Sequence, residues 1–218
     1  MNQPSIRVLM ACLGVGILFM GTLISVLAQK PLTPPELDAK VEKFLRENRA
    51  HWHDWNVPYQ DGKVLYDLII KNHYRSALEI GTSTGHSAIW IAWALSKTGG
   101  KLITIEIDEG RHKRALKNFR EAGVEDFIDA RLADAHQLVK ELAGPFDFVF
   151  SDADKEWYTQ YFKDVAPKLV KEGCFTAHNV TDSFGGIKEF LDYVRNLPNY
   201  QTTIDHSASS GISVSYKK

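Results

Sequence analysis

The sequence predicts an α/β protein with a mostly parallel sheet and helices on both of its faces. From residue 62 onward, short apolar runs typical of buried strands alternate with segments of helical periodicity, which is the pattern of strand–helix–strand units. The last two apolar runs have no helix between them and are joined only by the short stretch HSASSG. We therefore expect these two runs to form an antiparallel hairpin at the edge of the sheet.

A proline-containing linker and one helix precede this alternation. Pro31, Pro34 and Pro35 stiffen the linker, and a helix is expected to begin near Thr33 because apolar residues then recur at helical spacing. The apolar face of this helix consists of Leu37, Val41, Phe44 and Leu45.

The remaining elements follow from the length and periodicity of each apolar run. Strands are expected at residues 76–80, 101–107, 126–131, 146–151, 174–177, 200–205 and 212–216. Helices are expected at residues 64–71, 85–96, 109–122, 135–142, 155–171 and 187–196.

The first 28 residues differ from the rest of the chain. Residues 8–27 carry no charge, Arg7 precedes them, and Val26 and Ala28 are spaced as signal peptidase prefers. We expect residues 1–28 to be a signal peptide or a retained membrane anchor, since about 20 apolar residues also suffice to span a bilayer. With Arg7 on the cytoplasmic side, the protein would be exported (periplasmic) or anchored outside the cytosol. An anchor that faces the cytosol is the alternative.

The composition argues against a nucleic-acid partner and against a disulfide or a cysteine zinc site. The net charge is −1, and the 26 basic and 27 acidic residues are interleaved, so no basic block favours a nucleic-acid partner. Of the two cysteines, Cys12 lies in the apolar N-terminal segment and Cys174 in an expected strand. Removal of that segment would leave a single cysteine, which excludes an intrachain disulfide and a cysteine zinc site.

The loop after the first expected strand, GTSTGHS, is rich in glycine. In open parallel sheets, ligands bind beyond the carboxyl ends of the strands, and Gly81 and Gly85 would let the backbone approach a ligand closely. Ser83 and His86 stand where a nicotinamide-dinucleotide fingerprint needs glycine, so that cofactor is not favoured.

The next two strand ends carry acidic residues. Glu106 could accept hydrogen bonds from both hydroxyls of a ribose, as an acid at this place does in nucleotide-binding folds. Asp134 is either an acceptor for an adenine amino group or the N-cap of a helix. Together with the glycine loop, Glu106 favours a nucleoside ligand.

Polar residues also follow two neighbouring strands in the second half of the chain. Asp152, Asp154 and Lys155 come after one strand, and His178 and Asn179 come after the next. The loops should lie side by side, so Asp152, His178 and Asn179 could converge on one metal ion, with Lys155 nearby as a base.

The motifs LEIGTSTGHS, ITIEID, SDADKEWY and HNV resemble those of the cation-dependent O-methyltransferases, the family of catechol and caffeoyl-CoA O-methyltransferases. The resemblance runs from Asn56 to the C-terminus. It implies a seven-stranded Rossmann-like sheet and S-adenosylmethionine as methyl donor. The caffeoyl-CoA branch is usually dimeric, which leaves a homodimer open for this chain. The methyltransferase domain would be residues 62–218, with residues 29–61 as a linker and helix on the substrate side.

The resemblance also implies roles for individual residues. The cofactor-binding residues would be Glu79, Gly81, Ser83, Gly85, Ser87, Glu106, Asp134, Ala135 and Asp152. Lys155 would be the general base, with Asp152 as a second catalytic residue. The metal ligands would be Asp152, His178 and Asn179.

His178 departs from the family pattern, which has Asp-Asn where this chain has His178-Asn179. An imidazole in place of a carboxylate favours Mn²⁺ or another transition ion over Mg²⁺, or else weakens the metal site. Asp154 is a candidate source of the missing negative charge.

We expect transfer of a methyl group to a small phenolic, catechol-like hydroxyl, with Trp52 and Trp55 as walls for the aromatic ring. A metal would lower the pKa of the hydroxyl and Lys155 would accept its proton. Two alternatives remain: metal-independent transfer to sulfur or nitrogen, and a non-catalytic nucleoside-binding or scaffold protein.

Overall fold

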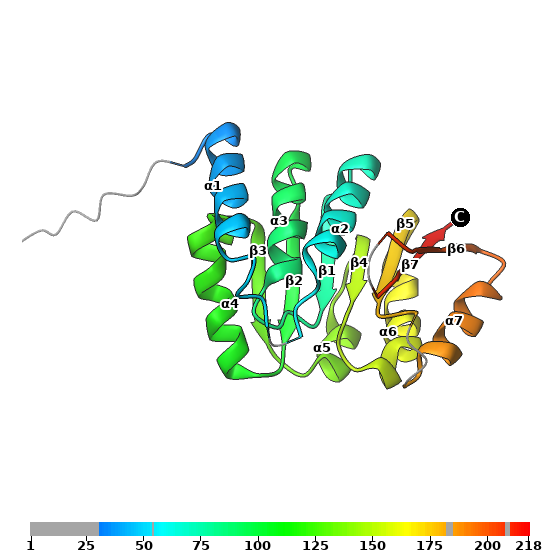
Figure 1. Ribbon diagram of the computed structural model, residues 1–218. Helices are drawn as coiled ribbons and strands as arrows, with labels where there is room; N and C mark the ends of the chain where they lie inside the picture. The colour runs from blue at the N-terminus through cyan, green and yellow to red at the C-terminus, as the bar shows by residue number, and fades with distance from the viewer. Residues whose placement is uncertain (1–30, 54, 182–184, 208–209) are drawn as a thin grey trace, which may run out of the picture. The chain divides into compact units, whose positions relative to one another are not determined.

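A seven-stranded sheet forms the centre of the computed structural model, which describes residues 31–53, 55–181, 185–207 and 210–218. Its strands are β1 (Ser76–Ile80), β2 (Lys101–Glu106), β3 (Ile128–Leu132), β4 (Phe146–Ser151), β5 (Leu169–His178), β6 (Tyr200–Asp205) and β7 (Ile212–Lys217). The strand order is β3-β2-β1-β4-β5-β7-β6 (Figure 1). β1 to β5 pair in parallel, and β7 runs antiparallel to both β5 and β6. The expected fold and the C-terminal hairpin are confirmed.

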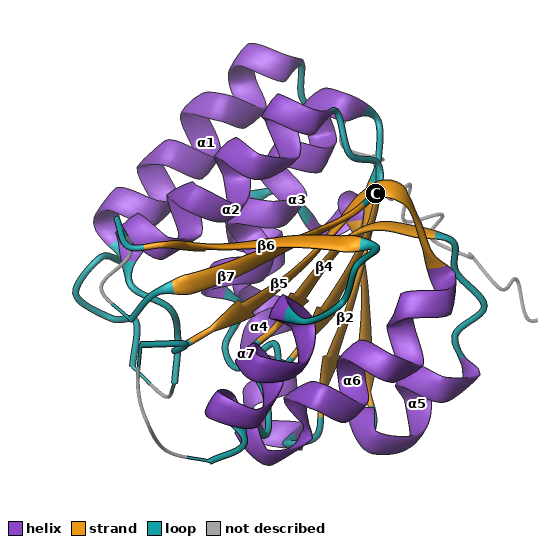
Figure 2. Cartoon of the chain, turned by 90° about the vertical axis from the view of Figure 1, so that its right-hand side faces the viewer, coloured by secondary structure: helices purple, strands orange, loops and turns teal. Residues whose placement is uncertain are grey.

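Seven α-helices of the described chain cover the two faces of this sheet. They are α1 (Pro34–Glu47), α2 (Tyr59–Asn72), α3 (His86–Thr98), α4 (Glu109–Ala122), α5 (Ala135–Glu141), α6 (Tyr158–Val165) and α7 (Ile187–Arg195). One apolar cluster joins α1 to α4 to one face, and a second cluster joins α5 to α7 to the other. Figure 2 shows α1, α2 and α3 on one side of the sheet and α5, α6 and α7 on the opposite side.

The N-terminal helix begins where the sequence predicts. Thr33 and Glu36 form a capping box at the start of α1, with the Thr33 backbone N–H donating to Glu36 Oε2 at 2.8 Å. All four residues of the predicted apolar face, Leu37, Val41, Phe44 and Leu45, are buried. α1 therefore packs against α3 and α4 with the face that its periodicity indicates.

Most element bounds agree with the prediction to within three residues, and the largest differences concern the helix expected at 155–171, the strand after it, and the helix expected at 64–71. The helix expected at 155–171 is wrong beyond Val165: a 3₁₀ turn (Ala166–Lys168) follows α6, and β5 begins at Leu169. Pro167 has no backbone N–H to continue a helix, and the apolar residues after it pair with β4 instead. α2 begins at Tyr59, earlier than expected, and so crosses position 61/62, where the domain boundary was expected. That domain division stays a prediction.

The order of strands creates a switch point between β1 and β4, where the chain's connections diverge to opposite sides. The loops that follow these two strands touch there. A Cβ on Gly81 would lie 3.0 Å from the backbone of Asp152 and Ala153, and Gly81 has a φ of +98°. Only glycine combines this conformation with this close approach, so Gly81 sets how closely the two loops approach each other.

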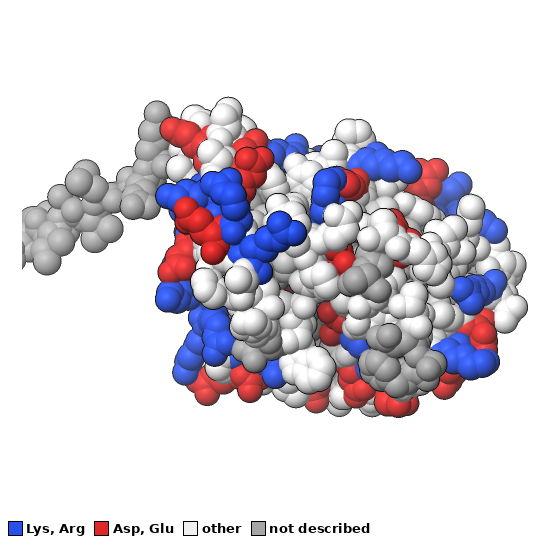
Figure 3. Space-filling model, in the orientation of Figure 1, with Lys and Arg blue, Asp and Glu red and all other residues white. Residues whose placement is uncertain are grey.

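Neither the surface charge nor the N-terminal segment indicates where a functional site lies. On the face in Figure 3, basic and acidic side chains are intermixed, without a broad patch of one sign. The expected signal or anchor segment lies outside the described residues. Within the described ranges, no helix is both long and apolar enough to cross a membrane.

Candidate active site

A cavity of about 820 Å³ opens at the carboxyl ends of the parallel strands. Residues from the loops after β1, β2, β3, β4 and β5 line it, and the segment just before α2 adds Trp55, Asn56 and Pro58. Of the predicted site residues, Gly81, Ser83, Glu106, Asp134, Ala135, Asp152, Lys155, His178 and Asn179 all line this cavity. Most of the predicted residues thus lie around one cavity, as expected for residues that follow the carboxyl ends of parallel strands.

Glu106 is held by the backbone around it. Its Oε2 accepts the Ser83 N–H at 2.7 Å, and its Oε1 accepts the N–H groups of Ile107 and Asp108 at 3.0 and 2.9 Å. The side chain is nearly buried yet still reaches the cavity wall. A carboxylate fixed in this way is a preorganised acceptor for a hydroxyl group of a ligand.

The end of the cavity beyond β3 is formed by an aromatic pair. Asp134 is the N-cap of α5 and accepts the His136 N–H at 2.9 Å, so it acts as a cap and also lines the cavity. The His136 ring stacks on Trp157 with their centroids 3.9 Å apart. Asp154 Oδ2 lies 3.5 Å from His136 Nε2, so Asp154 belongs to this end of the cavity.

Three predicted cofactor residues lie behind the cavity wall. Glu79, Gly85 and Ser87 are absent from its lining, and Glu79 is fully buried on the α3 side of β1. Burial raises the pKa of Glu79 to about 8, although the Ser87 and Thr104 hydroxyls that hydrogen-bond it lower that pKa. A Cβ on Gly85 would overlap the Phe119 ring at 2.5 Å. These residues support the glycine loop from within.

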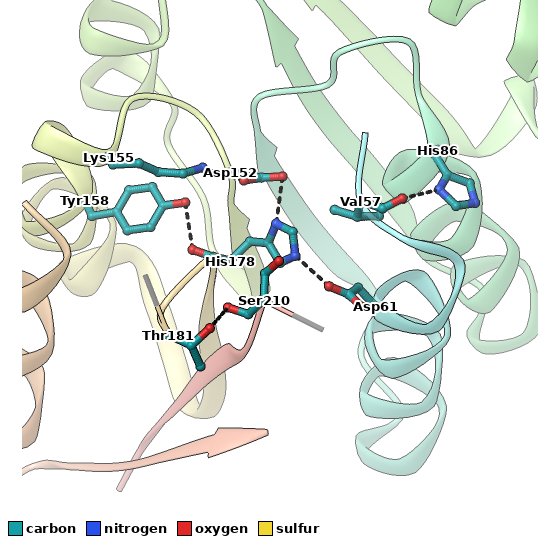
Figure 4. A network of polar contacts seen from close by, with 9 residues as sticks. All are labelled: Val57, Asp61, His86, Asp152, Lys155, Tyr158, His178, Thr181 and Ser210. Atoms are coloured by element: carbon teal, nitrogen blue, oxygen red, sulfur yellow. Dashed lines mark hydrogen bonds and ion pairs between the residues drawn. The ribbon is translucent and has the colours of Figure 1, made fainter. Parts of the chain in front are cut away.

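A chain of charged side chains lies at the other end of the cavity: Asp152, Lys155 and His178 line it, and Asp61 is buried behind them. Figure 4 shows these side chains. Lys155 Nζ lies 2.6 Å from Asp152 Oδ1, and Asp152 Oδ2 lies 3.2 Å from His178 Nδ1. On the far side of the ring, His178 Nε2 lies 2.6 Å from Oδ2 of Asp61, a carboxylate in the first turn of α2. The side chains of His178 and Asp61 are 4% and 0% exposed, so this network is a buried one.

The two carboxylates determine the charge of His178. Burial alone lowers the pKa of an imidazole, but the hydrogen bonds and charges of Asp152 and Asp61 outweigh burial and raise the pKa of His178 to about 9. The geometry agrees with this direction, because a ring whose two nitrogens both face carboxylate oxygens donates from both nitrogens only as an imidazolium.

The segment before α2 is fastened to the glycine loop by Asn56 and His86. Asn56 Nδ2 donates to Thr84 Oγ1 at 2.7 Å, and His86 Nδ1 hydrogen-bonds the Val57 carbonyl at 2.7 Å. Trp55, 84% exposed, lines the cavity as expected. Trp52 does not line the cavity, because it stacks on His86 with a centroid separation of 4.4 Å. Only one of the two predicted aromatic walls is therefore present.

The chain matches the family model described as O-methyltransferase over residues 35–201. This chain belongs to the O-methyltransferase family. It is 43% identical over 142 residues to a catechol O-methyltransferase of Niastella koreensis, a match that covers 58% of this chain and 64% of that protein. It is 34% identical over 147 residues to caffeoyl-CoA O-methyltransferase 1 of Eucalyptus globulus, covering 64% of this chain and 58% of that one. The matched segments thus span less than two thirds of either relative.

Solved structures of O-methyltransferases share the fold. An O-methyltransferase from Bacillus cereus, in complex with S-adenosylhomocysteine, superposes with a TM-score of 0.70 at 27% identity. The superposition covers 83% of this chain and 91% of that one. The sheet order seen here is that of the class I methyltransferases, and the resemblance drawn from the sequence motifs is confirmed.

The metal that the cation-dependent branch of the O-methyltransferase family implies does not fit these residues. A histidine ligates a metal through a nitrogen with a free lone pair, and both ring nitrogens of His178 lie against carboxylates. Asp152 is bonded to Lys155 and His178 at the same time. The part of the chain that the structure describes contains no group of three or more His, Cys, Asp or Glu that could hold a metal ion. The expected ligand set of Asp152, His178 and Asn179 therefore forms no metal site in this arrangement.

Asp61 is the residue of this buried network that sequence reasoning misses. It lies 117 residues from His178 in the chain, just before the helix that the sequence predicts at 64–71. The negative charge expected from Asp154 comes from Asp61 instead. The one signal in the sequence is the replacement of a carboxylate by His178, because a buried imidazolium requires a carboxylate partner.

Proposed function

We propose that this protein transfers a methyl group from S-adenosylmethionine to a hydroxyl group of a small phenolic, catechol-like compound. One observation carries the proposal: a single cavity joins the fixed carboxylate of Glu106 to the Lys155–Asp152–His178 chain. A nucleoside donor and an aromatic acceptor would share that space, as methyl transfer requires. The names of the relatives from Niastella koreensis and Eucalyptus globulus agree with such an acceptor.

The donor side of the proposal rests on the Gly81–Glu106 region. Gly81 brings backbone to the cavity without a side chain, and Glu106 offers a carboxylate oxygen to a ribose hydroxyl. Asp134 and Ala135 line the place expected for the adenine, next to the stacked His136 and Trp157 rings. The Bacillus cereus relative, which was solved with S-adenosylhomocysteine, supports the same ligand class for this chain.

The acceptor side rests on Lys155. The substrate oxygen attacks the methyl carbon, the new C–O bond forms as the C–S bond breaks, and the positive charge on sulfur disappears. The hydroxyl proton must leave, and Lys155 would accept it after its own ammonium group, which is paired with Asp152, has released a proton to solvent. Asp152, 2.6 Å away, would stabilise the ammonium ion that results. No step of this scheme uses the Mn²⁺ or other divalent ion that the sequence predicted, because the residues do not fit one.

Two other functions are distinguishable from this proposal. Transfer to sulfur or nitrogen would use the same donor, but a thiol or amine needs no second hydroxyl beside it. A nucleoside-binding scaffold would bind S-adenosylhomocysteine without turnover. The lysine and carboxylate at the acceptor end favour a reaction in which a proton is removed.

The test combines binding and turnover. Isothermal titration should show S-adenosylhomocysteine binding, and mass spectrometry should show methylation in a panel of catechols, thiols and amines, with catechols preferred. Lys155→Met should lower kcat by roughly 10²-fold or more while S-adenosylhomocysteine still binds. Lys163→Met on the outer side of α6 is the matched control, with kcat unchanged. Absence of S-adenosylhomocysteine binding, or a preference for thiols or amines, would refute the proposal.

We also propose that residues 1–28 direct the protein to a membrane, either for export or as an anchor. The uncharged run at 8–27 after Arg7 supports this proposal. Because the donor is made in the cytosol, an anchored domain that faces the cytosol is the alternative topology. Homodimerisation, expected from the caffeoyl-CoA branch, likewise stays a prediction that sedimentation would test.

A further inference from the structure

We propose that His178, clamped between Asp61 and Asp152, takes the place of the divalent cation, so that this protein transfers methyl groups without a bound metal. The inference rests on the proposed methyltransferase function and assigns Asp61 a role as a positioning residue. The inference depends on the carboxylates that the two ring nitrogens of His178 face, and on the packing that holds Asp61 in place.

The clamp is built from two elements that lie far apart in the sequence. His178 is the last residue of β5, and its side chain points to the face of the sheet that α2 covers. α2 places Asp61 against Nε2 of that ring, as Figure 4 shows. Directly after Asp61, Gly62 lets the Trp90 ring lie against the helix, in space that a Cβ would fill. α2 is thereby seated on α3, and Asp61 is seated with it.

A second buried histidine in the same region, His86, shows how different hydrogen-bond partners change the charge of the ring. His86 Nδ1 faces the Val57 carbonyl, an acceptor, while its Nε2 accepts the N–H of Trp90 at 3.1 Å. One donated and one accepted hydrogen bond suit a neutral ring, and burial lowers the pKa of His86 to about 4. His178 has carboxylate oxygens against both of its ring nitrogens instead, and only a ring that carries a proton on each nitrogen can donate to both.

The imidazolium of His178 faces the cavity in which methyl transfer would take place. His178 lines the cavity with Lys155 and Asn179, whereas Asp61 is buried behind it. Protonation of His178 offsets the negative charges of Asp61 and Asp152, so a phenolic oxygen that loses its proton here meets less repulsion than it would beside a neutral ring, and this is the electrostatic part of a metal ion's task. The ring cannot chelate two oxygens as a metal does, so orientation of the substrate must come from the cavity walls, including Trp55.

The first test uses the unmodified protein. After treatment with a chelator, catechol methylation by the wild type should stay within about twofold of its starting rate, and Mn²⁺ paramagnetic resonance should show no bound ion with S-adenosylhomocysteine present. A rate that disappears with the chelator and returns with Mn²⁺, or a stoichiometric bound Mn²⁺, would overturn the inference. Failure of the proposed function is a different result, in which neither chelated nor Mn²⁺-supplied protein methylates any compound.

The second test restores the carboxylate of the family pattern. His178→Asp should reduce metal-free turnover by roughly 100-fold or more, since it removes the cation. It should also create a Mn²⁺ site that restores part of the rate. His73→Asp is the matched control: His73 is exposed at the other end of α2, about 18 Å from Asp61 at 1.5 Å per residue, and should leave both readouts unchanged. An equal metal-free rate in His178→Asp would overturn the inference.

The third test examines Asp61. In Asp61→Asn, kcat should fall roughly tenfold or more while the KM for S-adenosylmethionine stays within about twofold. Nitrogen NMR should show both ring nitrogens of His178 protonated in the wild type at neutral pH and one of them unprotonated in Asp61→Asn. If Asp61→Asn does not fold, the wild-type spectrum still decides, because an unprotonated ring nitrogen of His178 in that spectrum would refute the clamp.

Discussion

Replacement of Glu106 by alanine should weaken binding of S-adenosylhomocysteine by roughly 10- to 150-fold. Glu106 is expected to hold the ribose of the donor, and its surroundings set the size of the effect. A carboxylate has about four lone-pair sites. Three of those on Glu106 are taken by the backbone N–H groups of Ser83, Ile107 and Asp108. One strong acceptor site therefore remains for the donor.

The magnitude follows from that single site. A hydrogen bond to a charged group contributes about 1.5–3 kcal/mol, and each 1.4 kcal/mol corresponds to a tenfold change in affinity. Loss of two independent bonds, about 3–6 kcal/mol, would weaken binding by roughly 150-fold to more than 10⁴-fold, so the one remaining site predicts the smaller effect. The substitution also leaves three backbone N–H groups without their acceptor, and these groups should lower the melting temperature of the free protein.

Isothermal titration with S-adenosylhomocysteine measures the change, and circular dichroism confirms that the variant is folded at the titration temperature. Asp108→Asn is the matched control, because it removes a neighbouring negative charge while an asparagine still caps α4 in place of Asp108. Unchanged affinity in Glu106→Ala would remove Glu106 from the donor site. An equal loss in Asp108→Asn would show that general charge, and not the Glu106 carboxylate, is responsible.

Three further predictions concern stability, packing and location. Burial raises the pKa of Glu79 to about 8 from its ordinary 4.5, so the free energy of unfolding that the protonated acid contributes is complete below about pH 4.5 and is lost as the pH rises to about 8. Urea unfolding between about pH 5 and 8 should therefore show a decline in stability that Glu79→Gln flattens. An unchanged slope in the variant would contradict this prediction. Gly62→Ala should cost about 1–3 kcal/mol in the same assay because the new methyl group overlaps the Trp90 ring, and a neutral effect would show that α2 can shift. A reporter active only outside the cytosol, fused after Lys218, should be active if residues 8–27 direct export; a silent reporter with Met1 retained would support a cytosol-facing anchor.

Local patterns in the sequence were sufficient for most of the fold. β4 and α4 have the predicted bounds, because a run such as Phe146–Ser151 is too short and too apolar for anything but a buried strand, and Asp108 and Gly123 mark the ends of α4. The strand-end residues could be collected into one site for a related reason: parallel strands end at the same edge. The error after Val165 arose where a helical pattern runs into Pro167 and the following strand.

The sequence by itself therefore determined the seven strands, the glycine loop and the acid that follows β2, since these depend on periodicity and on the direction of the chain. Tertiary structure decided which residues reach the cavity and which carry charge. Glu79 lies in a motif at the end of a strand, yet its side chain is buried on the α3 side and does not reach the cavity. Asp61 lies in a helix that carries no sequence motif, yet its side chain contacts His178. The physical reason is that the charge of a buried group depends on the atoms packed around it, and for His178 one of those atoms belongs to a residue 117 positions away.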